Sequence, residues 1–582
     1  MKYTITSYPL AALVFLLHGC ATQPPEQTTG TTPAETPVAE QHKPAAPVTQ
    51  SSRDSITPDM IYNTLAGEIA AQRGESGLAY DYAYKAALES RSVEAAERAT
   101  GLGLQANQPQ QALQAAQLWI EIAPNSLKAH QIAAILNLRI DNTNAGIRHL
   151  QRVVEIANGE GQPGYMQAAA IAEKGSSPAQ AMAIMQQLVP DDSKDPEALY
   201  AMALVASQAK QLQLAGEYID RVLQIDPKST KALVLKAHTL IGMGKKDGGI
   251  AFLNQAVEKS PDDLTLRSAF ARMLLELNEA KKAFEQYRAM HRLQPDNPDT
   301  LYALGVLSMQ MERLDRAKLY FKELVDRHQR INEASYYLGV IAEEEKRTDA
   351  ALDWYSRVEG ENQADAQVRI AKILADSGSL NEARETLQRL RVNDPQNLLK
   401  FYMIEAELLR DNQQYEAANE VYTKALETYE DNTDLLYARG LNAADMGRVD
   451  LLEQDLRKIL ATDPDHADAL NALGYTLADK TDRLQEAKGY IEKALALKPE
   501  NPAILDSMGW VEFRLGNLQA ALGYLQQAAK LSPDAEIASH LGEVLWQMGD
   551  KEEARKIWQA ANDREPKNHF IKPVMQRLGA EK

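Results

Sequence analysis

The sequence is nearly devoid of cysteine, because Cys20 is the only one among 582 residues. Without a second cysteine the chain forms no internal disulfide, so packing has to supply its stability. Positive charge is also scarce: 63 Lys and Arg residues face 81 Asp and Glu residues, and the net charge is −18. A surface of that sign repels nucleic acid and anionic lipid headgroups. This composition argues against nucleic acid as a partner.

The sequence also contains none of the short motifs that are typical of catalytic or phosphate-binding sites, such as HExxH, GxSxG, CxxC or GxxxxGK[ST]. Its nearest glycine-rich stretch, "GMGKKDGG" at residues 242–249, is expected to be a turn between two helices. The nine histidines that follow Cys20 are scattered singly, without the spacing of metal ligands. We therefore predict a protein that is not an enzyme, with no catalytic, cofactor-binding or metal site.

One apolar run occurs at the very start of the chain. It extends from Leu10 to Leu17, and Lys2 is the only charge before it. Such a run is typical of a secretory signal peptide and is too short to cross a bilayer, which takes about 20 apolar residues. Its end, Leu17-His18-Gly19-Cys20, resembles the bacterial lipobox, in which the chain is cut before a lipidated cysteine. We predict a signal peptide at residues 1–19 and lipid attachment at Cys20, since a buried free cysteine would find nothing to pack against here.

Residues 20–55 are rich in Pro, Thr, Gln and Ala and contain almost no large apolar side chains. Such a segment buries too little surface to fold and is expected to be disordered. A flexible chain of this length spans about 30 Å. We predict a tether that holds the folded part away from a membrane.

Proline recurs at a nearly constant interval through the rest of the chain. Pro227, Pro261 and Pro295 are 34 residues apart, and a second series follows at Pro464, Pro499, Pro533 and Pro566. A fixed period of this length indicates a repeat architecture. Proline disfavours helix in the residue before it, so each of these positions is expected to end a helix.

Each unit carries the same pattern, as in "LNALGYTLADKTDRLQEAKGYIEKALALKP" and "LDSMGWVEFRLGNLQAALGYLQQAAKLSP". This pattern resembles the tetratricopeptide repeat, which implies an all-α fold, a right-handed α-solenoid of about 12–14 helical hairpins. We predict divergent repeats at residues 56–195, a regular array at 196–567 and a C-terminal capping helix at 568–582. Small residues in the first helices are expected to let neighbouring helices approach closely; they are Ala203, Ala237, Ala271, Gly305, Gly339, Ala371, Gly440, Gly474, Gly509 and Gly542.

In tetratricopeptide solenoids the first helices line a concave groove. The register of the last three repeats places nine residues there as a predicted protein-binding groove: Asn471, Tyr475, Asp479, Asp506, Trp510, Phe513, Ser539, Glu543 and Trp546. Aromatic side chains beside hydrogen-bonding groups suit a peptide-binding surface. The alternative, that these aromatics only pack between repeats, remains open. The groove is not basic, which disfavours a C-terminal carboxylate as its ligand.

The whole chain resembles a proteobacterial family of outer-membrane tetratricopeptide-repeat lipoproteins. The resemblance rests on the lipobox, the tether, "AGEIAAQRGESGLAYDYAYKAALESRSVEAAERA" and the closing "NALGYTLAD", "LDSMGWVEFRLG" and "HLGEVLWQMGD". One member of this family is the adaptor of a periplasmic carboxy-terminal processing protease. The resemblance implies a scaffold that binds that serine protease and its substrates, peptidoglycan crosslink hydrolases. It also implies an address at the periplasmic face of the outer membrane.

Two other functions are compatible with the sequence. One is a lipoprotein that assists assembly of an outer-membrane secretion, pilus, β-barrel or polysaccharide-export complex. The other is a cell-wall enzyme hidden in residues 127–195, where no nucleophile is paired with a base.

Overall fold

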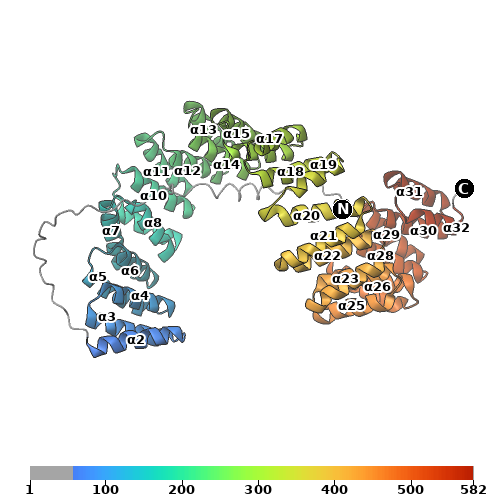
Figure 1. Cartoon of the computed structure of the whole chain (residues 1–582), viewed down its shortest axis with the longest axis horizontal. Coiled ribbons are helices and arrows are strands. Elements are labelled where there is room, and N and C mark those ends of the chain that lie inside the picture. The colour runs from blue at the N-terminus through green and yellow to red at the C-terminus, as the bar shows by residue number, and fades with distance from the viewer. Residues whose placement is uncertain (1–56, 581–582) are drawn as a thin grey trace, which may run out of the picture. The chain divides into compact units, whose positions relative to one another are not determined.

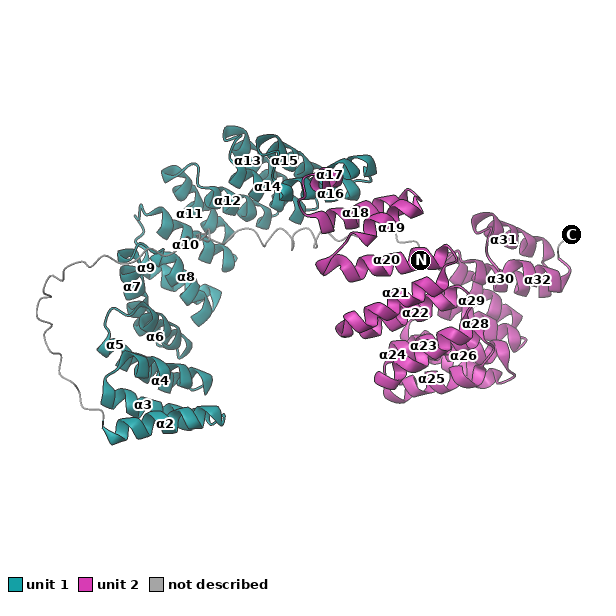
Figure 2. Ribbon diagram, in the orientation of Figure 1, with its two compact units in different colours: residues 1–320 teal, residues 321–582 magenta. Residues whose placement is uncertain are grey.

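The computed structural model describes residues 57–580, and it contains α-helices, two short 3-10 helices and no strand within that range. The predicted signal peptide, Cys20 and the tether lie outside the described residues. The chain divides into two compact units, residues 1–320 and residues 321–582, with the boundary inside α17 (Figure 2). Each unit is described by itself.

The first unit is a series of helices, most of which are labelled in Figure 1. They are α2 (Pro58–Gln72), α3 (Ser76–Ser90), α4 (Val93–Gln105), α5 (Pro109–Ile122), α6 (Leu127–Arg139), α7 (Thr143–Gly159), α8 (Gly164–Gly175), α9 (Pro178–Leu188), α10 (Pro196–Gln208), α11 (Leu212–Ile225), α12 (Thr230–Gly242), α13 (Lys246–Lys259), α14 (Leu264–Glu276), α15 (Ala280–Leu293), α16 (Pro298–Gln310) and α17 (Leu314–Asp326).

The second unit continues the series. Its helices are α18 (Ile331–Glu344), α19 (Thr348–Ser356), α20 (Gln363–Asp376), α21 (Leu380–Asn393), α22 (Leu398–Asp411), α23 (Tyr415–Thr428), α24 (Thr433–Asp445), α25 (Val449–Thr462), α26 (Ala467–Lys480), α27 (Leu484–Leu497), α28 (Pro502–Arg514), α29 (Leu518–Leu531), α30 (Ala535–Gln547), α31 (Lys551–Arg564) and α32 (Ile571–Leu578).

Taken two at a time in chain order, helices α2 to α31 form fifteen pairs, slightly more than the 12–14 hairpins expected. The difference arises because the sequence before residue 196 also folds into four complete pairs, although it has lost most of the repeat motif. The prolines end helices as predicted: α11, α13 and α15 each stop two residues before Pro227, Pro261 and Pro295. Short polar side chains start many first helices; Asn432 and Asn501, for example, accept hydrogen bonds from first-turn backbone N–H groups. The all-α repeat fold predicted from the sequence is confirmed.

Small residues in the first helices allow the predicted close approach in four repeats. A Cβ atom added at Gly339, Gly474 or Gly509 would lie 2.5–2.6 Å from a side chain of the second helix, and one at Gly542 would lie 2.2 Å from Trp558 Nε1. Gly440 differs, because the nearest side-chain atom would lie 3.6 Å away. The second helix therefore touches the backbone of the first at the four close glycines.

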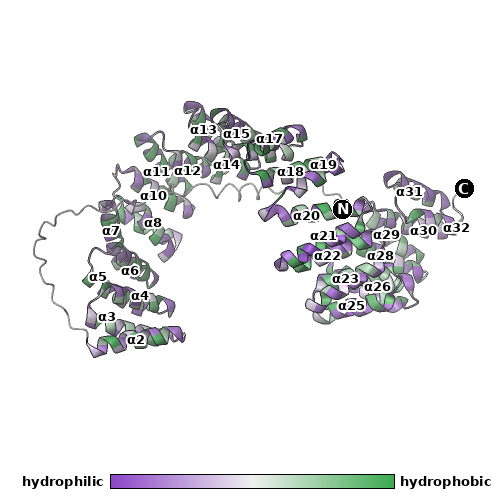
Figure 3. Cartoon of the chain, viewed as in Figure 1, coloured by the Kyte–Doolittle hydropathy of each residue, from purple (hydrophilic) through white to green (hydrophobic). Residues whose placement is uncertain are grey.

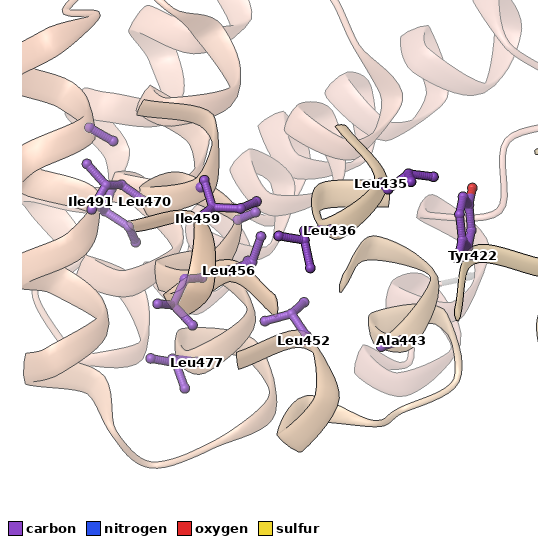
Figure 4. Close-up of a cluster of buried hydrophobic side chains, with 14 of the residues drawn as sticks. Tyr422, Leu435, Leu436, Ala443, Leu452, Leu456, Ile459, Leu470, Leu477 and Ile491 are labelled. Atoms are coloured by element: carbon purple, nitrogen blue, oxygen red, sulfur yellow. The ribbon is translucent and has the colours of Figure 1, made fainter. Parts of the chain in front are cut away.

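The core of each unit runs along the stacked pairs. Figure 4 shows part of one hydrophobic cluster, in which Leu436, Leu452, Leu456 and Ile459 are buried between α24, α25 and their neighbours. Burial of each such side chain stabilises the fold by about 1.5–3 kcal/mol. The labelled helices carry both hydrophobic and hydrophilic residues (Figure 3). Of the helices described, none is long and apolar enough to cross a membrane.

Candidate protein-binding surfaces

The nine predicted groove residues lie on three first helices of the second unit: α26, α28 and α30. Four of them, Asp506, Trp510, Ser539 and Glu543, are buried, and the other five are partly buried. Most contact one another or the end of the chain. We call Tyr475, Asp506, Trp510, Glu536 and His540 the inner cluster.

Two polar contacts hold the inner cluster together. The Tyr475 hydroxyl donates a hydrogen bond to Glu536 Oε1 at 3.1 Å, which joins α26 to α30. His540 Nδ1 lies 2.9 Å from Asp506 Oδ2, which joins α28 to α30. The indole of Trp510 stacks on the His540 ring with a centroid distance of 4.3 Å. Three successive repeats are thus connected through side chains on one face.

Burial and charge shift the pKa values of this cluster upwards. Burial by itself would lower the pKa of His540, but the adjacent Asp506 carboxylate outweighs it and raises that pKa above 6.5. Burial, assisted by the nearby Asp506 charge, raises the pKa of Glu536, although His540 opposes the shift. Burial and the Glu536 charge also raise the pKa of Tyr475. The cluster therefore favours the protonated form of all three groups.

The residues nearest the carboxy-terminus contact helix α32. The buried Glu543 carboxylate accepts two hydrogen bonds from the Arg577 guanidinium, at 2.8 and 2.7 Å. The Ser539 hydroxyl lies 3.4 Å from the Phe570 carbonyl oxygen. Val574 and Leu578 pack against the core that contains Ile571. Helix α32 thus packs against the last repeat.

The remaining groove residues are more exposed to solvent, or carry a polar atom without a hydrogen-bond partner. Trp546 lies beside Trp558 and under the cations of Lys551 and Arg555. Phe513 stacks on Trp510, and the Asp479 carboxylate pairs with Lys480. Two buried atoms in this region, Asn471 Oδ1 and Trp510 Nε1, have no hydrogen-bond partner. The role of these nine residues in binding a protein stays a prediction.

A second candidate surface lies at the other end of the described chain, on α2. Four large apolar side chains, Ile61, Tyr62, Leu65 and Ile69, are 50–61% exposed. Their spacing places them on one helix face, opposite Asn63, Gly67 and Ala70, which are buried. We call these four residues the α2 strip. A contiguous exposed apolar strip is typical of a protein-binding surface.

Sequence reasoning missed three residues that organise the first surface and the whole of the second. His540 directly follows the predicted Ser539 on α30, and Glu536 lies three residues before Ser539, but neither was among the predicted groove residues. Arg577 lies in the predicted capping helix. The one indication of its contact with Glu543 was their separation of 34 residues in the sequence, which equals one repeat. The α2 strip carried a recognisable signal, namely apolar residues at helical spacing in the first repeat.

The histidines are less isolated than their positions in the sequence indicated. His130 Nδ1 lies 3.0 Å from His149 Nδ1, and the other ring nitrogen of His130 lies 3.0 Å from the Pro124 carbonyl oxygen. Burial lowers the pKa of His149 to about 4. Across residues 57–580 no group of three or more His, Cys, Asp or Glu side chains is placed to hold a metal ion.

These features define a helical-repeat protein whose exposed chemistry is that of protein-binding surfaces. Residues 302–366, 437–502 and 507–568 match the tetratricopeptide repeat model, and residues 178–256 match the model of anaphase-promoting complex, cyclosome, subunit 3.

The chain is 33% identical to TPR repeat-containing protein PA4667 of Pseudomonas aeruginosa, over 92% of its own length and 90% of that protein. It belongs to this family of tetratricopeptide-repeat proteins. It is also 23% identical to cellulose synthase operon protein C of Pseudomonas fluorescens, over 57% of this chain and 31% of that protein. Among solved structures, yeast Tom70 is similar at 16% identity, with 77% of this chain and 94% of that chain covered and a TM-score of 0.36.

Proposed function

We propose that the protein is a non-catalytic scaffold, an outer-membrane lipoprotein that binds a periplasmic carboxy-terminal processing serine protease and its peptidoglycan hydrolase substrates. The coarser part of this conclusion, a repeat scaffold that binds proteins, rests on the tetratricopeptide fold and on the relative in Pseudomonas aeruginosa. The finer part rests on the resemblance of the sequence to the lipoprotein family that includes LbcA. The proposed anchor is a lipid on Cys20 at the periplasmic face of the outer membrane.

The observation that carries the proposal is the α2 strip. Four large apolar side chains exposed on one helix are costly to leave in water and are covered at low cost by a partner with an apolar patch. The strip begins only a few residues after the proposed tether, so a partner bound there would be linked to the membrane through the tether. A scaffold that binds two proteins at once makes their encounter intramolecular, at an effective concentration of roughly millimolar.

The test is a reconstitution with purified protease, hydrolase and the mature chain. We expect the mature chain to accelerate hydrolase degradation, because it raises the local concentration of substrate at the protease. The double variant Ile61→Glu, Leu65→Glu should lose at least about tenfold of that acceleration, since two charges would have to be buried in the interface. Val392→Glu, at a side chain that is 78% exposed on α21, is the matched control and should leave the rate unchanged. Equal degradation with and without the protein would refute the proposal.

One observation favours a second function. The relative in Pseudomonas fluorescens is named for a cellulose synthase operon, which points towards assembly of a polysaccharide-export complex. A deletion strain separates the two functions. Accumulated hydrolases with normal polymer export would support the protease scaffold, and lost polymer export with normal hydrolase levels would support the assembly factor.

A further inference from the structure

A cavity of about 240 Å³ opens in the first unit between α12, α13 and α14. The three helices are labelled in Figure 1. The cavity exists because α13 packs against α14 less closely than the second helix packs against the next first helix in the neighbouring repeats. Ala256 and Ser260, one turn apart, present short side chains to this space. The larger apolar groups around it, Leu233, Phe252 and Leu266, leave the gap unfilled.

The size and lining of the cavity indicate what it accommodates. An apolar cavity of about 150 Å³ is large enough for benzene, so this one has room for a leucine or phenylalanine side chain. It is smaller than the pockets of about 300–1,000 Å³ that hold cofactors and other small molecules. A single apolar side chain therefore fits the cavity better than a whole small molecule.

Two lysines give the rim of the cavity a charge opposite to that of the protein as a whole. Lys228 lies before α12 and Lys259 ends α13, and both are exposed. Neither ammonium group has an ion-pair partner among the described residues. Asp263 also lines the cavity, but its carboxylate accepts a hydrogen bond from the Leu266 backbone N–H at 2.9 Å and starts α14. The lysines are thus left available for an external anion.

We propose that this cavity is a docking pocket for a partner polypeptide that inserts one apolar side chain and offers an adjacent Asp or Glu side chain to Lys228 and Lys259. A side-chain carboxylate suits these two residues because lysine is a flexible point charge that tolerates variable geometry. A chain-terminal carboxylate is typically captured by converging backbone N–H groups, whereas the cationic groups at this rim are the flexible side chains of Lys228 and Lys259. The pocket shares no residue with the α2 strip or the inner cluster.

The probe is a blocked peptide, acetyl-Gly-Phe-Glu-Gly-amide, titrated into the mature chain with ¹³C-labelled leucine methyl groups. We expect saturable shifts of the Leu233 and Leu266 methyl signals. The peptides with Gln in place of Glu and with Ala in place of Phe test the two parts of the ligand separately. Loss of the acidic group should weaken binding about two- to fivefold, as for an exposed charge pair, and loss of the phenyl ring should abolish it.

Charge reversal at the rim tests the lysines without disturbing the core. Lys228→Glu, Lys259→Glu should reduce binding of the Glu peptide more than that of the Gln peptide. The control is Lys210→Glu, Lys281→Glu, which makes the same charge change at two other exposed positions of the unit. Ala256→Phe fills the cavity and should abolish binding of both peptides. Absence of methyl shifts, or equal binding of the Glu and Gln peptides, would overturn the proposal, whereas failure of the protease reconstitution would leave it intact.

Discussion

The Tyr475 hydroxyl donates a hydrogen bond to Glu536 Oε1 across 61 residues of sequence and two repeats. Between them Trp510 stacks on His540, so the hydrogen bond and the stacked rings brace the same three first helices. Repeat proteins are stabilised mainly by contacts between nearest neighbours. A side-chain bond that reaches the second neighbour therefore adds cooperativity to the carboxy-terminal part of the array.

Replacement of Tyr475 by phenylalanine should loosen that part of the array. Tyr475→Phe removes the only hydroxyl bonded to the largely buried Glu536 carboxyl group and should cost about 1–2 kcal/mol. We expect faster amide hydrogen exchange in α26 and α30, with α4 and α5 unchanged. Tyr524→Phe is the control, because Tyr524 is also partly buried against the same core and its hydroxyl forms no hydrogen bond within residues 57–580. Equal effects of the two variants would contradict a specific role for the Tyr475 hydrogen bond.

The stability of the second unit should fall as pH rises through the neutral range. The pKa of His540 is raised on folding, so its contribution is complete below about pH 6.5 and is lost as pH rises through the folded pKa. The raised pKa of Glu536 acts with the same sign. Thermal unfolding from pH 6 to 9 measures the effect. Asp506→Asn removes the hydrogen-bonded carboxylate that raises the pKa of His540, while Glu536 and Asp479 still act in the same direction. The melting temperature should therefore fall less across this range than in the parent chain.

Helix α32 should detach when its ion pair is broken. Arg577→Met leaves the buried Glu543 carboxylate without its bidentate partner, and because Arg577 is itself largely exposed we expect a cost of about 1–3 kcal/mol. Limited proteolysis should then cut residues 565–580 faster. Lys572→Met, at an exposed position of the same helix, should leave the cleavage rate unchanged. The double variant Arg577→Met, Glu543→Leu should recover part of the resistance, because no unpaired charge remains.

Two glycine substitutions should change stability in opposite directions. Gly542→Ala forces a Cβ atom into the indole of the buried Trp558 and should destabilise the second unit by about 1–3 kcal/mol. Gly489→Ala adds a Cβ atom within α27 where nothing lies within 4 Å, and helix propensity predicts a gain of about 0.5–1 kcal/mol. Chemical denaturation of the two variants, compared with the parent chain, measures both effects.

Much of the fold could be predicted from the sequence because each repeat motif determines the structure of its own hairpin. Pro227 and Pro261 each end a helix because the proline ring restricts the backbone. Gly474 and Gly509 permit close helix packing because they have no side chain. These effects act within one hairpin of about 34 residues. The signal weakens before residue 196, where the motif is lost, and the helices there are recognisable only from their apolar spacing.

The candidate site was harder to predict because it depends on how successive repeats are rotated. Asp506 and Trp510 lie on α28 and Ser539 lies on α30, but the repeat register gave no sign that the His540 ring would contact Asp506. Nor did it indicate that the carboxylate of Glu543 would be covered by Arg577.

The sequence alone determined the helical hairpins, their period and the presence of a single cysteine. Only the tertiary structure decided which polar groups are enclosed in the inner cluster, which apolar groups of α2 stay exposed, and where α13 and α14 leave a cavity. The physical reason is that helix formation depends on residues close together in the sequence, whereas burial depends on how successive repeats stack. Short side chains at an interface between helices, such as those of Ala256 and Ser260, change that packing locally.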